Sequence, residues 1–518
     1  MESVDVRWRC RAKIARGEKT IQNPGYWKRN KPQRKSELSR RAILQSIGWG
    51  TATAALMPAA GMYGQSVSPV MTKLSDYMSG ARAQELPEIV MEKTKQHVLD
   101  TFAAMVSGSE LPPGQAALKF ARSYGGEKVA TVVSSNVVCG PIEAAFANGI
   151  LAHSDETDDS HTISAVHPGA SVVSATLAAG EKFGISGTHF LRAVALGYDI
   201  GTRVVLVLGG PDYQTASHQS VHSIGAIYCA ASAAGCAASL DSQQMRWLLD
   251  YTTQQSAGIA AWERDTQHME KAFVFAGAPA RDAVMTALLV QAGWTGVDDI
   301  FTGGHNYFLA HGYTANPAGL VDGLGTHYNI VETNIKKWSV GSPIQATLDA
   351  LENLRKRHPF EADDVDKVIV RIEPREASVV DNRVMPDVCL QHLIGVMLID
   401  KTVTFASAHD KARMLDPAIL RQRAKAQLIP DVELARLMPK RVTVVDLILK
   451  DGTRLSERVE AVRGAYDNPM TNEEVAGKAR ELMAPVLGAE QTNRLIEKLM
   501  GLENVKNVLE LRPLLQRA

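Results

Sequence analysis

Cysteine and net charge are scarce in this sequence of 518 residues, and both absences narrow what the protein can be. The cysteines are few, widely spaced and odd in number, and no two form a CxxC pair, so neither a disulfide scaffold nor a structural zinc site is indicated. They are Cys10, Cys139, Cys229, Cys236 and Cys389. Lysine plus arginine and aspartate plus glutamate both number 56, which leaves no net charge to attract nucleic acid or an anionic membrane. We therefore expect no nucleic-acid partner, and a small molecule bound in a pocket.

Nucleotide-binding motifs are also missing. The sequence has no GxGxxG after a strand pattern and no GxxxxGK(S/T), which excludes the common nucleotide-dependent enzymes. What it does have is length and apolar content. Hydrophobic residues make up 45% of the chain, as in a soluble globular protein, and 518 residues exceed one ordinary core. We therefore expect two domains plus appendages.

Residues 1–65 predict a removable N-terminal leader. A basic stretch leads to Arg40 and Arg41, and a moderately apolar run follows over residues 42–57. The pattern resembles a twin-arginine export signal, and its apolar run is shorter than the roughly 20 residues that a membrane span needs. We expect export to the periplasm, cleavage between residues 61 and 66, and no stable membrane insertion of the mature chain. The alternative is a basic amphipathic tail on a cytoplasmic protein.

Residues 75–330 carry the pattern of an all-helical domain. Apolar residues recur at helical spacing, and alanine and glycine occupy many of these positions. Small residues on successive helices let their backbones approach closely, which predicts a compact bundle. The expected helices span residues 87–107, 140–153, 171–183, 188–208, 223–238, 242–260 and 280–292.

The pattern changes after the helical stretch, and residues 335–510 predict a smaller α+β domain. Residues 368–372 read as a strand, and the runs 442–449 and 455–462 flank a tight Asp-Gly turn. A Thr471–Glu474 capping box then predicts a helix. We therefore expect a mainly α protein with a second α+β domain. One arrangement open to its last helices is to pack back on the helical domain.

The densest group of chemically active side chains lies at residues 153–161, in the sequence HSDETDDSH, followed by the His-Pro-Gly of residues 167–169. Four acids in five residues cannot all be buried and charged, so we expect a loop whose groups face water or a ligand. Three interpretations are open at this point. The segment is a solvated acidic loop that caps helices, a metal site of carboxylates and imidazoles, or part of an active site.

This segment resembles the HxxDxDDTH…HPG signature of the MmgE/PrpD family, which includes 2-methylcitrate dehydratase, cis-aconitate decarboxylase and iminodisuccinate epimerase. On this match Ser160 takes the usual threonine position, and His167 is the histidine of the His-Pro pair. Glu156 falls where the first aspartate normally stands, unless Asp155 substitutes for it by a small shift. The resemblance extends over roughly residues 75–510 and implies a helical N-terminal domain and an α+β C-terminal domain.

Three further stretches fit the same family. In the segment HQSVHSIG, the family's active-site histidine corresponds to His218 or His222. Lys271 resembles the lysine that precedes a Gly/Ala-rich helix, and the alternative for it is a surface ion pair with Glu270. Lys336 matches the stretch that opens the second domain, where the alternative is a solvated domain junction.

The resemblance implies an enzyme that removes a proton next to a carboxylate of a small polycarboxylate. Such chemistry needs a base with a pKa near neutrality and cations that hold carboxylates, and histidine and lysine supply both. The catalytic candidates are His167, Lys271, Asp155 and Ser160, and the substrate-binding candidates are His218, His222, Lys336 and Asp159. We expect no metal and no other cofactor, and the resemblance implies a homodimer.

The favoured function is a lyase, similar to a 2-methylcitrate dehydratase, that acts on a di- or tricarboxylate. The alternatives are an epimerase or isomerase that uses the same proton abstraction, and a non-catalytic periplasmic binder of organic acids. Decarboxylase-type members carry a tyrosine near Arg371 that this chain lacks, so we do not expect a cis-aconitate decarboxylase. Four histidines without motif support are interpreted as structural or rim residues: His268, His305, His311 and His392.

Overall fold

The computed structural model describes residues 66–311 and 315–517. The arginine pair and the apolar run of the predicted leader lie outside the described residues, as does Cys10. Export to the periplasm therefore stays a prediction. The first described helix, α1 (Pro69–Gly80), begins where Ser68 caps the N–H of Met71.

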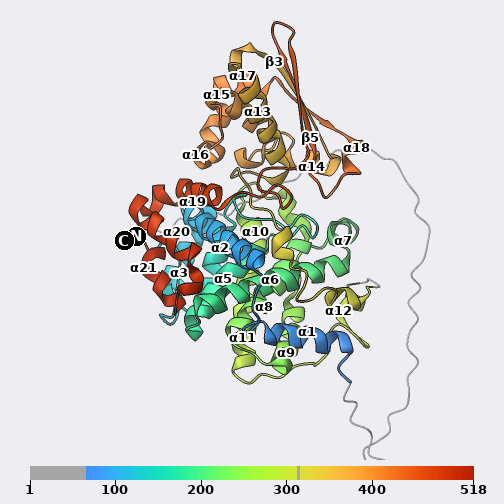
Figure 1. The fold of residues 1–518 in the computed structure, drawn as a ribbon, viewed down its shortest axis with the longest axis vertical. Coiled ribbons are helices and arrows are strands. Elements are labelled where there is room, and N and C mark those ends of the chain that lie inside the picture. The colour runs from blue at the N-terminus through green and yellow to red at the C-terminus, as the bar shows by residue number, and fades with distance from the viewer. Residues whose placement is uncertain (1–65, 312–314, 518) are drawn as a thin grey trace, which may run out of the picture. The chain divides into compact units, whose positions relative to one another are not determined.

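Helices dominate the first and larger part of the described chain (Figure 1). After α1 come α2 (Glu88–Gly108), α3 (Pro112–Tyr124), α4 (Pro141–Ala152), α5 (Pro168–Phe183), α6 (Gly187–Leu208), α7 (Gly210–Ser217), α8 (Val221–Ala237), α9 (Ser242–Gln255), α10 (Met269–Ala272), α11 (Ala278–Gln291) and α12 (Tyr307–Ala310). The short ladder of β1 (Ala130–Thr131) and β2 (Val138–Cys139) is a non-helical element that the sequence pattern did not predict.

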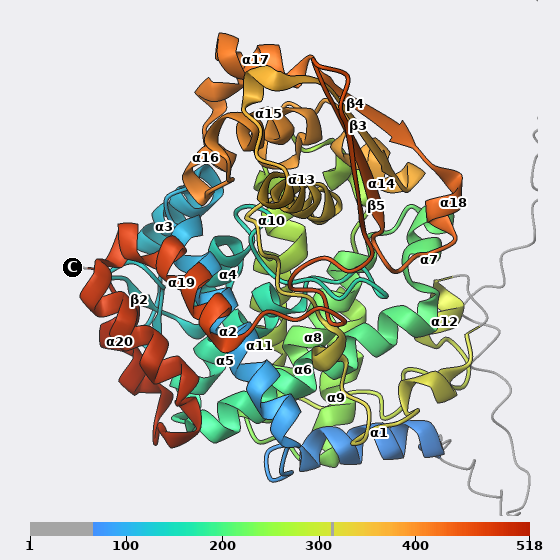
Figure 2. The ribbon, with the colours of Figure 1, turned by 45° about the horizontal axis from the view of Figure 1, so that its top comes forward.

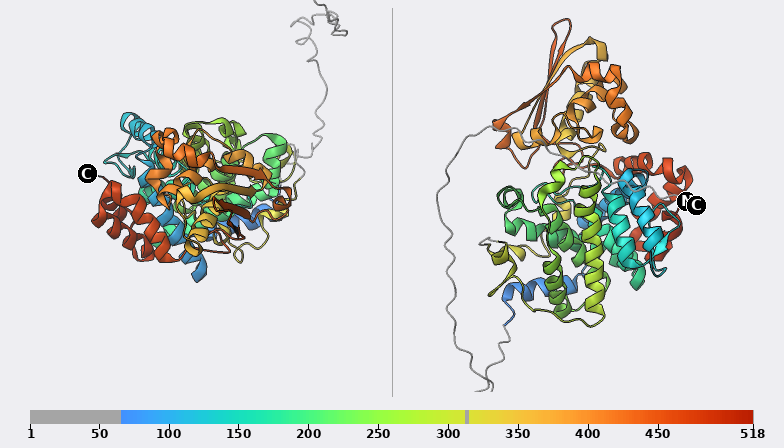
Figure 3. Two further views of the ribbon diagram at one scale, coloured as in Figure 1. Left: turned by 90° about the horizontal axis from the view of Figure 1, so that it is seen from above. Right: turned by 180° about the vertical axis from the view of Figure 1, so that it is seen from behind.

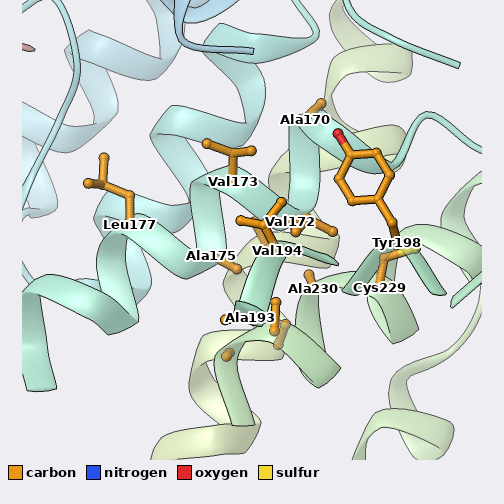
Figure 4. Close-up of a cluster of buried hydrophobic side chains, with 14 of the residues drawn as sticks. Ala170, Val172, Val173, Ala175, Leu177, Ala193, Val194, Tyr198, Cys229 and Ala230 are labelled. Atoms are coloured by element: carbon orange, nitrogen blue, oxygen red, sulfur yellow. The ribbon is translucent and has the colours of Figure 1, made fainter. Parts of the chain in front are cut away.

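Small residues let the central helices α5, α6 and α8 pack closely. A Cβ added to Gly201 of α6 would stand 2.4 Å from the carbonyl oxygen of Gly225 in α8, so only glycine fits there. Cys229 is buried in the same layer and behaves as a small apolar residue. Figure 4 shows Tyr198 among alanine and valine side chains, with its hydroxyl pointing toward the start of α5.

The second part of the chain contains a four-stranded sheet with the order β4-β3-β5-β6. Its strands are β3 (Val365–Ile372), β4 (Ala426–Pro430), β5 (Thr443–Leu449) and β6 (Arg454–Val459). β3 pairs parallel to β4 and antiparallel to β5, and β5 and β6 form a hairpin. Gly452 in the hairpin turn has a φ of +89°, which explains why glycine stands there.

Helices cover one face of this sheet (Figure 2). They include α13 (Gln345–Arg357) and α15 (Leu390–Asp400), whose apolar residues share a hydrophobic core with β3 and β5. The remaining helices of this part are α14 (Pro374–Val380), α16 (Phe405–His409), α17 (Pro417–Arg423) and α18 (Val432–Ala435).

The last helices lie beside the helical part of the chain (Figure 3). They are α19 (Asn472–Leu487), α20 (Ala489–Met500) and α21 (Arg512–Leu515). The predicted capping box is present, because Thr471 accepts from the N–H of Glu474 and Glu474 from that of Thr471. α19 packs along α2, and its buried residues belong to the hydrophobic core of the helical part.

The predicted fold class is confirmed: the protein is mainly α, with a smaller α+β part in the C-terminal half. Element ends differ by a few residues. The helix expected at 242–260 ends at Gln255, and β6 ends at Val459. The run Met269–Gln291 is long and apolar enough to cross a membrane by length and composition alone, but 56% of its most apolar window is buried, and core helices pass the same test.

Candidate active site

An acidic loop, residues 153–167, connects α4 to α5 and forms the centre of the candidate site. α5 begins at Pro168, because proline suits the first helical position. The groups of this loop were expected to face water or a ligand; none of its four carboxylates faces water, because all are buried with exposures of 0 to 4%. They are Asp155, Glu156, Asp158 and Asp159. Burial is tolerated because each has a lysine or histidine partner.

Asp159 lies at the base of the loop, inside the helical core. Its Oδ2 is 2.7 Å from Nδ1 of His97 and accepts the hydroxyl of Tyr198 at 2.5 Å. Its Oδ1 accepts the N–H of Gly169 at 3.0 Å, at the start of α5, where the helix dipole favours a negative charge. A Cβ on Gly169 would lie 2.9 Å from that oxygen, so glycine is required. Both oxygens of Asp159 are therefore occupied by the protein itself.

Glu156 stands at the centre of a group of cations. Its Oε1 accepts from Lys271 Nζ and lies 3.1 Å from Nε2 of His268. Lys336 Nζ donates to the backbone carbonyl of Glu156 at 2.8 Å and lies 3.7 Å from Oε2. Burial alone would raise the pKa of Glu156, but Lys271, His268 and Lys336 outweigh it and hold that pKa well below its usual value. Glu156 is therefore ionised at neutral pH.

Asp158 bridges two histidines. Its Oδ2 is 2.8 Å from Nδ1 of His153, and its Oδ1 is 3.2 Å from Nδ1 of His167 and 3.5 Å from Lys336 Nζ. Burial would raise the pKa of Asp158, but the two imidazoles and Lys336 hold it well below the usual value. Burial lowers the pKa of His153 to about 4, with Asp158 only partly offsetting it, so His153 is neutral.

Aromatic rings pack against the histidines of the site. Phe275 comes from η2 (Phe273–Gly277), a π-helical turn between α10 and α11, and such turns often occur at functional sites. Its ring stacks on His222 at 4.1 Å and on His153 at 4.7 Å between centroids. The edge of Trp262 meets the same ring at 4.8 Å. Burial, and then the nearby His167 and Lys271, hold the pKa of His222 well below its usual value, so His222 is neutral.

Asp155 faces the α+β part of the chain. Its Oδ2 lies 2.9 Å from Nε2 of His409 at the end of α16, and its Oδ1 accepts the N–H of Thr157 at 3.0 Å. Nδ1 of His409 lies 2.7 Å from the carbonyl oxygen of Phe405. Burial lowers the pKa of His409, but its contact with Asp155 outweighs burial and raises the pKa to about 9. The two parts of the chain therefore meet through a buried, charged pair.

Ser160 ties the acidic loop to the segment that joins the two parts. Its N–H donates to Asn334 O at 3.0 Å, and Asn334 N–H donates back to Ser160 O at 2.9 Å. Two residues later, Lys336 is buried and reaches Glu156. Ser160 and Lys336 line a cavity of about 50 Å³ together with residues that precede β5 and follow β6. The geometry therefore places Ser160 beside a cavity.

The structure brings four of the predicted site residues into one cluster. They are His167, Lys271, Lys336 and His222, of which His167 and His222 stand 5.8 Å apart between ring centroids. His218 lies outside the cluster, because it caps the end of α7 with an exposed side chain. Lys271 pairs with Glu156 rather than forming the surface pair with Glu270 considered from sequence.

Sequence reasoning missed several members of the cluster. His268 was interpreted as a structural or rim residue, and no motif pointed to His409 or to Lys478 of α19, which donates to Thr157 O at 3.0 Å. The signal that could have identified His268 is its place three residues before Lys271. One ring nitrogen each of His153 and His167 and an Asp158 oxygen lie close enough together to hold a metal ion, but Lys336 beside Asp158 opposes a further cation.

Comparison with known proteins matches both parts of the chain to domains of one family. The MmgE/PrpD N-terminal domain matches residues 72–317, and the MmgE/PrpD C-terminal domain matches residues 338–502. The cis-aconitate decarboxylase-like protein oryM of Aspergillus oryzae is 24% identical, with 86% of this chain and 97% of that protein covered. The cis-aconitate decarboxylases of Aspergillus terreus and Homo sapiens are each 22% identical, with 86% and 84% of this chain and 96% and 92% of those proteins covered. The chain belongs to the MmgE/PrpD family.

Proposed function

We propose that this chain is a lyase that removes a proton next to a carboxylate of a small di- or tricarboxylate. Its family, with relatives named cis-aconitate decarboxylase, supports a lyase. One observation carries the finer proposal: buried, ionised Asp158 holds one ring nitrogen of His167, whose side chain is still 10% exposed. A carboxylate that orients an imidazole in this way is the usual support of a general base.

His167 is the proposed acid and base. Because an ionised carboxylate can only accept, Nδ1 of His167 carries the hydrogen of its contact with Asp158, and the lone pair of Nε2 takes the proton from the substrate carbon. The electron pair of the broken C–H bond forms a carbon–carbon double bond as the hydroxyl on the neighbouring carbon leaves. The imidazolium returns its proton to that hydroxyl, which departs as water.

The lysines are proposed to hold the substrate carboxylate and the negative charge that develops beside it. An ammonium group has three donors, and among the described residues Lys271 spends one on Glu156 and Lys336 one on a backbone carbonyl. Charge-assisted hydrogen bonds of this kind are strong where water is excluded. Glu156 and Asp158 neutralise the two lysines before the substrate arrives.

Unpartnered ring nitrogens belong to the same cluster. Nε2 of His153, Nδ1 of His222 and Nδ1 of His268 are buried without a hydrogen-bond partner among the described residues. Buried polar atoms are normally satisfied, so three such atoms in one cluster support a ligand that supplies their partners. A neutral imidazole such as His222 can donate a hydrogen bond to a carboxylate without adding charge.

Exchange in heavy water tests the proposal. The protein is incubated with a panel of di- and tricarboxylates in deuterium oxide, and NMR measures deuterium next to each carboxylate together with any product. We expect incorporation and loss of water for at least one member of the panel. A His218→Ala variant is the matched control, and it should retain full exchange because His218 is exposed and outside the cluster.

The alternatives give different results in the same experiment. Inversion at the labelled carbon without loss of water or CO2 would identify an epimerase, and CO2 release would identify a decarboxylase. Binding of a carboxylate without any exchange would contradict the lyase proposal and identify a binder.

A further inference from the structure

The residues that line the cavity beside Ser160 and Lys336 are of several types, and they include the charged Lys440, Arg441 and Glu460. Its other lining residues include Gln345 of α13, the segment 439–441 before β5, and the segment 460–467 after β6. Its volume of about 50 Å³ compares with the roughly 10–15 Å³ that one water needs by the same kind of measure. The cavity therefore has room for a small polar group such as a carboxylate.

Most charges around this cavity are already paired. Glu460 contacts Arg458, and Asp467 lies 3.9 Å from Lys440. Arg463 is held by Glu474 through two nitrogens. These pairs leave the acids of the lining neutralised, so they do not repel an anion from the cavity.

Arg441 differs from these residues. Its Nε lies 2.7 Å from Oε1 of buried Glu376, but neither atom makes an aligned hydrogen bond among the described residues. No hydrogen bond joins its two terminal nitrogens to another described group, although the side chain is only 22% exposed. A guanidinium carries five donors in a planar fork that matches a carboxylate. Arg441 therefore lines a small cavity with most of its donors unused.

We propose that this cavity is a carboxylate subsite, in which Arg441 binds one carboxylate of the substrate beside Lys336 and Ser160. The inference rests on the proposed function, and it deepens that function by naming what selects the substrate. Lys336 links the two places, because it lines the cavity and its Nζ reaches Glu156 and Asp158. Arg441 then selects molecules that carry a second carboxylate.

The competing interpretation is that Arg441 serves only as the counterion of Glu376. Burial raises the pKa of Glu376, and Arg441 partly offsets that rise, so the pair has structural value of its own. A structural pair explains the contact through Nε. It does not explain why Arg441 lines a cavity while no hydrogen bond joins its terminal nitrogens to another described group.

Binding measurements on the full mature protein test the subsite without requiring turnover. Calorimetry compares propane-1,2,3-tricarboxylate and glutarate with their monomethyl esters, for the unmodified protein and for Arg441→Gln. We expect Arg441→Gln to weaken binding of the free acids by about 10- to 100-fold, the value of one or two charge-assisted hydrogen bonds, and to reduce the preference for acids over esters. Arg441→Lys should lose less, because it keeps the charge and not the fork.

Two further variants keep the result interpretable. Lys440→Gln is the matched control, since Lys440 lines the same cavity but is 54% exposed, and it should change binding by less than about twofold. If Arg441→Gln folds poorly because Glu376 loses its counterion, the double variant Arg441→Gln, Glu376→Gln removes both charges, and the same loss of binding is expected.

Binding of the free acids by folded Arg441→Gln within twofold of the unmodified protein would overturn the subsite, and so would an equal loss in Lys440→Gln. Failure of the lyase proposal looks different. In that case the unmodified protein binds carboxylates and shows no deuterium exchange, while the dependence on Arg441 remains. An absence of binding for every acid in the panel would overturn the subsite as well.

Discussion

Two regions of the acidic loop use carboxylates in opposite ways. At its core end, Asp159 has both oxygens occupied by His97, Tyr198 and the N-terminus of α5. At its cluster end, Glu156 and Asp158 contact lysines and histidines that keep unused donors or unpartnered nitrogens. The comparison shows that the number of acids in a sequence does not by itself reveal function. The informative property is whether the partners of each acid have made all of their hydrogen bonds.

The largest expected effect comes from substituting His167, beside the cluster end of the loop. His167→Ala should lower kcat by about 10²- to 10⁴-fold, a typical share for a positioned acid or base, while substrate affinity changes little. Steady-state kinetics and deuterium exchange on a confirmed substrate measure both. Full exchange in this variant would place the base elsewhere, and His222 becomes the next candidate because its ring stands 5.8 Å away.

A substitution at the core end of the loop, at Asp159, should affect folding instead. Asp159→Ala leaves His97, the Tyr198 hydroxyl and the Gly169 N–H without their common acceptor, and we expect a loss of about 3–5 kcal/mol in the free energy of unfolding. Tyr198→Phe removes only one of these bonds and should cost about 1–2 kcal/mol. Denaturant titrations give the values. An unchanged free energy of unfolding in Asp159→Ala would contradict the structural role assigned to Asp159.

A substitution of Lys271 tests whether the cations at the cluster end of the loop bind the substrate. Lys271→Ala should raise KM by about 10- to 100-fold, because it removes a charged hydrogen bond to the substrate carboxylate. It also leaves Glu156 with fewer cations, so the pKa of Glu156 should rise toward its usual value. Kinetics and NMR titration of Glu156 measure the two effects. A variant with unchanged KM would count against carboxylate binding at Lys271.

The smallest expected effect concerns the pair that joins the two parts of the chain. The pKa of His409 is raised to about 9 in the folded protein, above its ordinary value near 6.5. A raised pKa contributes stability that is fully present below about 6.5 and is lost as the pH rises through 9. Between pH 7 and 10 we therefore expect a loss on the order of 2 kcal/mol. The acids that face His409 are Asp155 and Asp387.

His409→Asn provides the control for this pH dependence. Asparagine keeps a hydrogen-bond donor near Asp155 but does not titrate, so the fall in stability between pH 7 and 10 should become shallower. Thermal unfolding at several pH values measures it. Identical slopes for both proteins would show that another group causes the loss.

Much of the fold could be predicted because the relevant signals are local. The change from helical to strand periodicity, the Asp-Gly turn at Gly452 and the capping box at Thr471 all depend on a few neighbouring residues, and the structure contains each of them. Element ends were less accurate, as at Gln255, because packing rather than propensity decides where a helix stops.

The burial of the acidic loop could not be predicted in the same way. Four neighbouring acids favour a solvated loop unless their partners are known, and those partners come from distant positions. His97 is 62 residues from Asp159, Lys271 is 115 residues from Glu156, and Lys336 is 180 residues from Glu156. Only their convergence offsets the cost of burying the charges.

The sequence by itself determined the family, the order of the two parts and the residues His167, Lys271 and Lys336 as candidates, because motifs and periodicity are local properties. The tertiary structure alone decided that His222 rather than His218 joins the cluster, and that Asp159 belongs to the core. It also brought Arg441 to the cavity beside Lys336. These outcomes depend on which side chains meet in space, and the energy of a buried charge is decided by those neighbours.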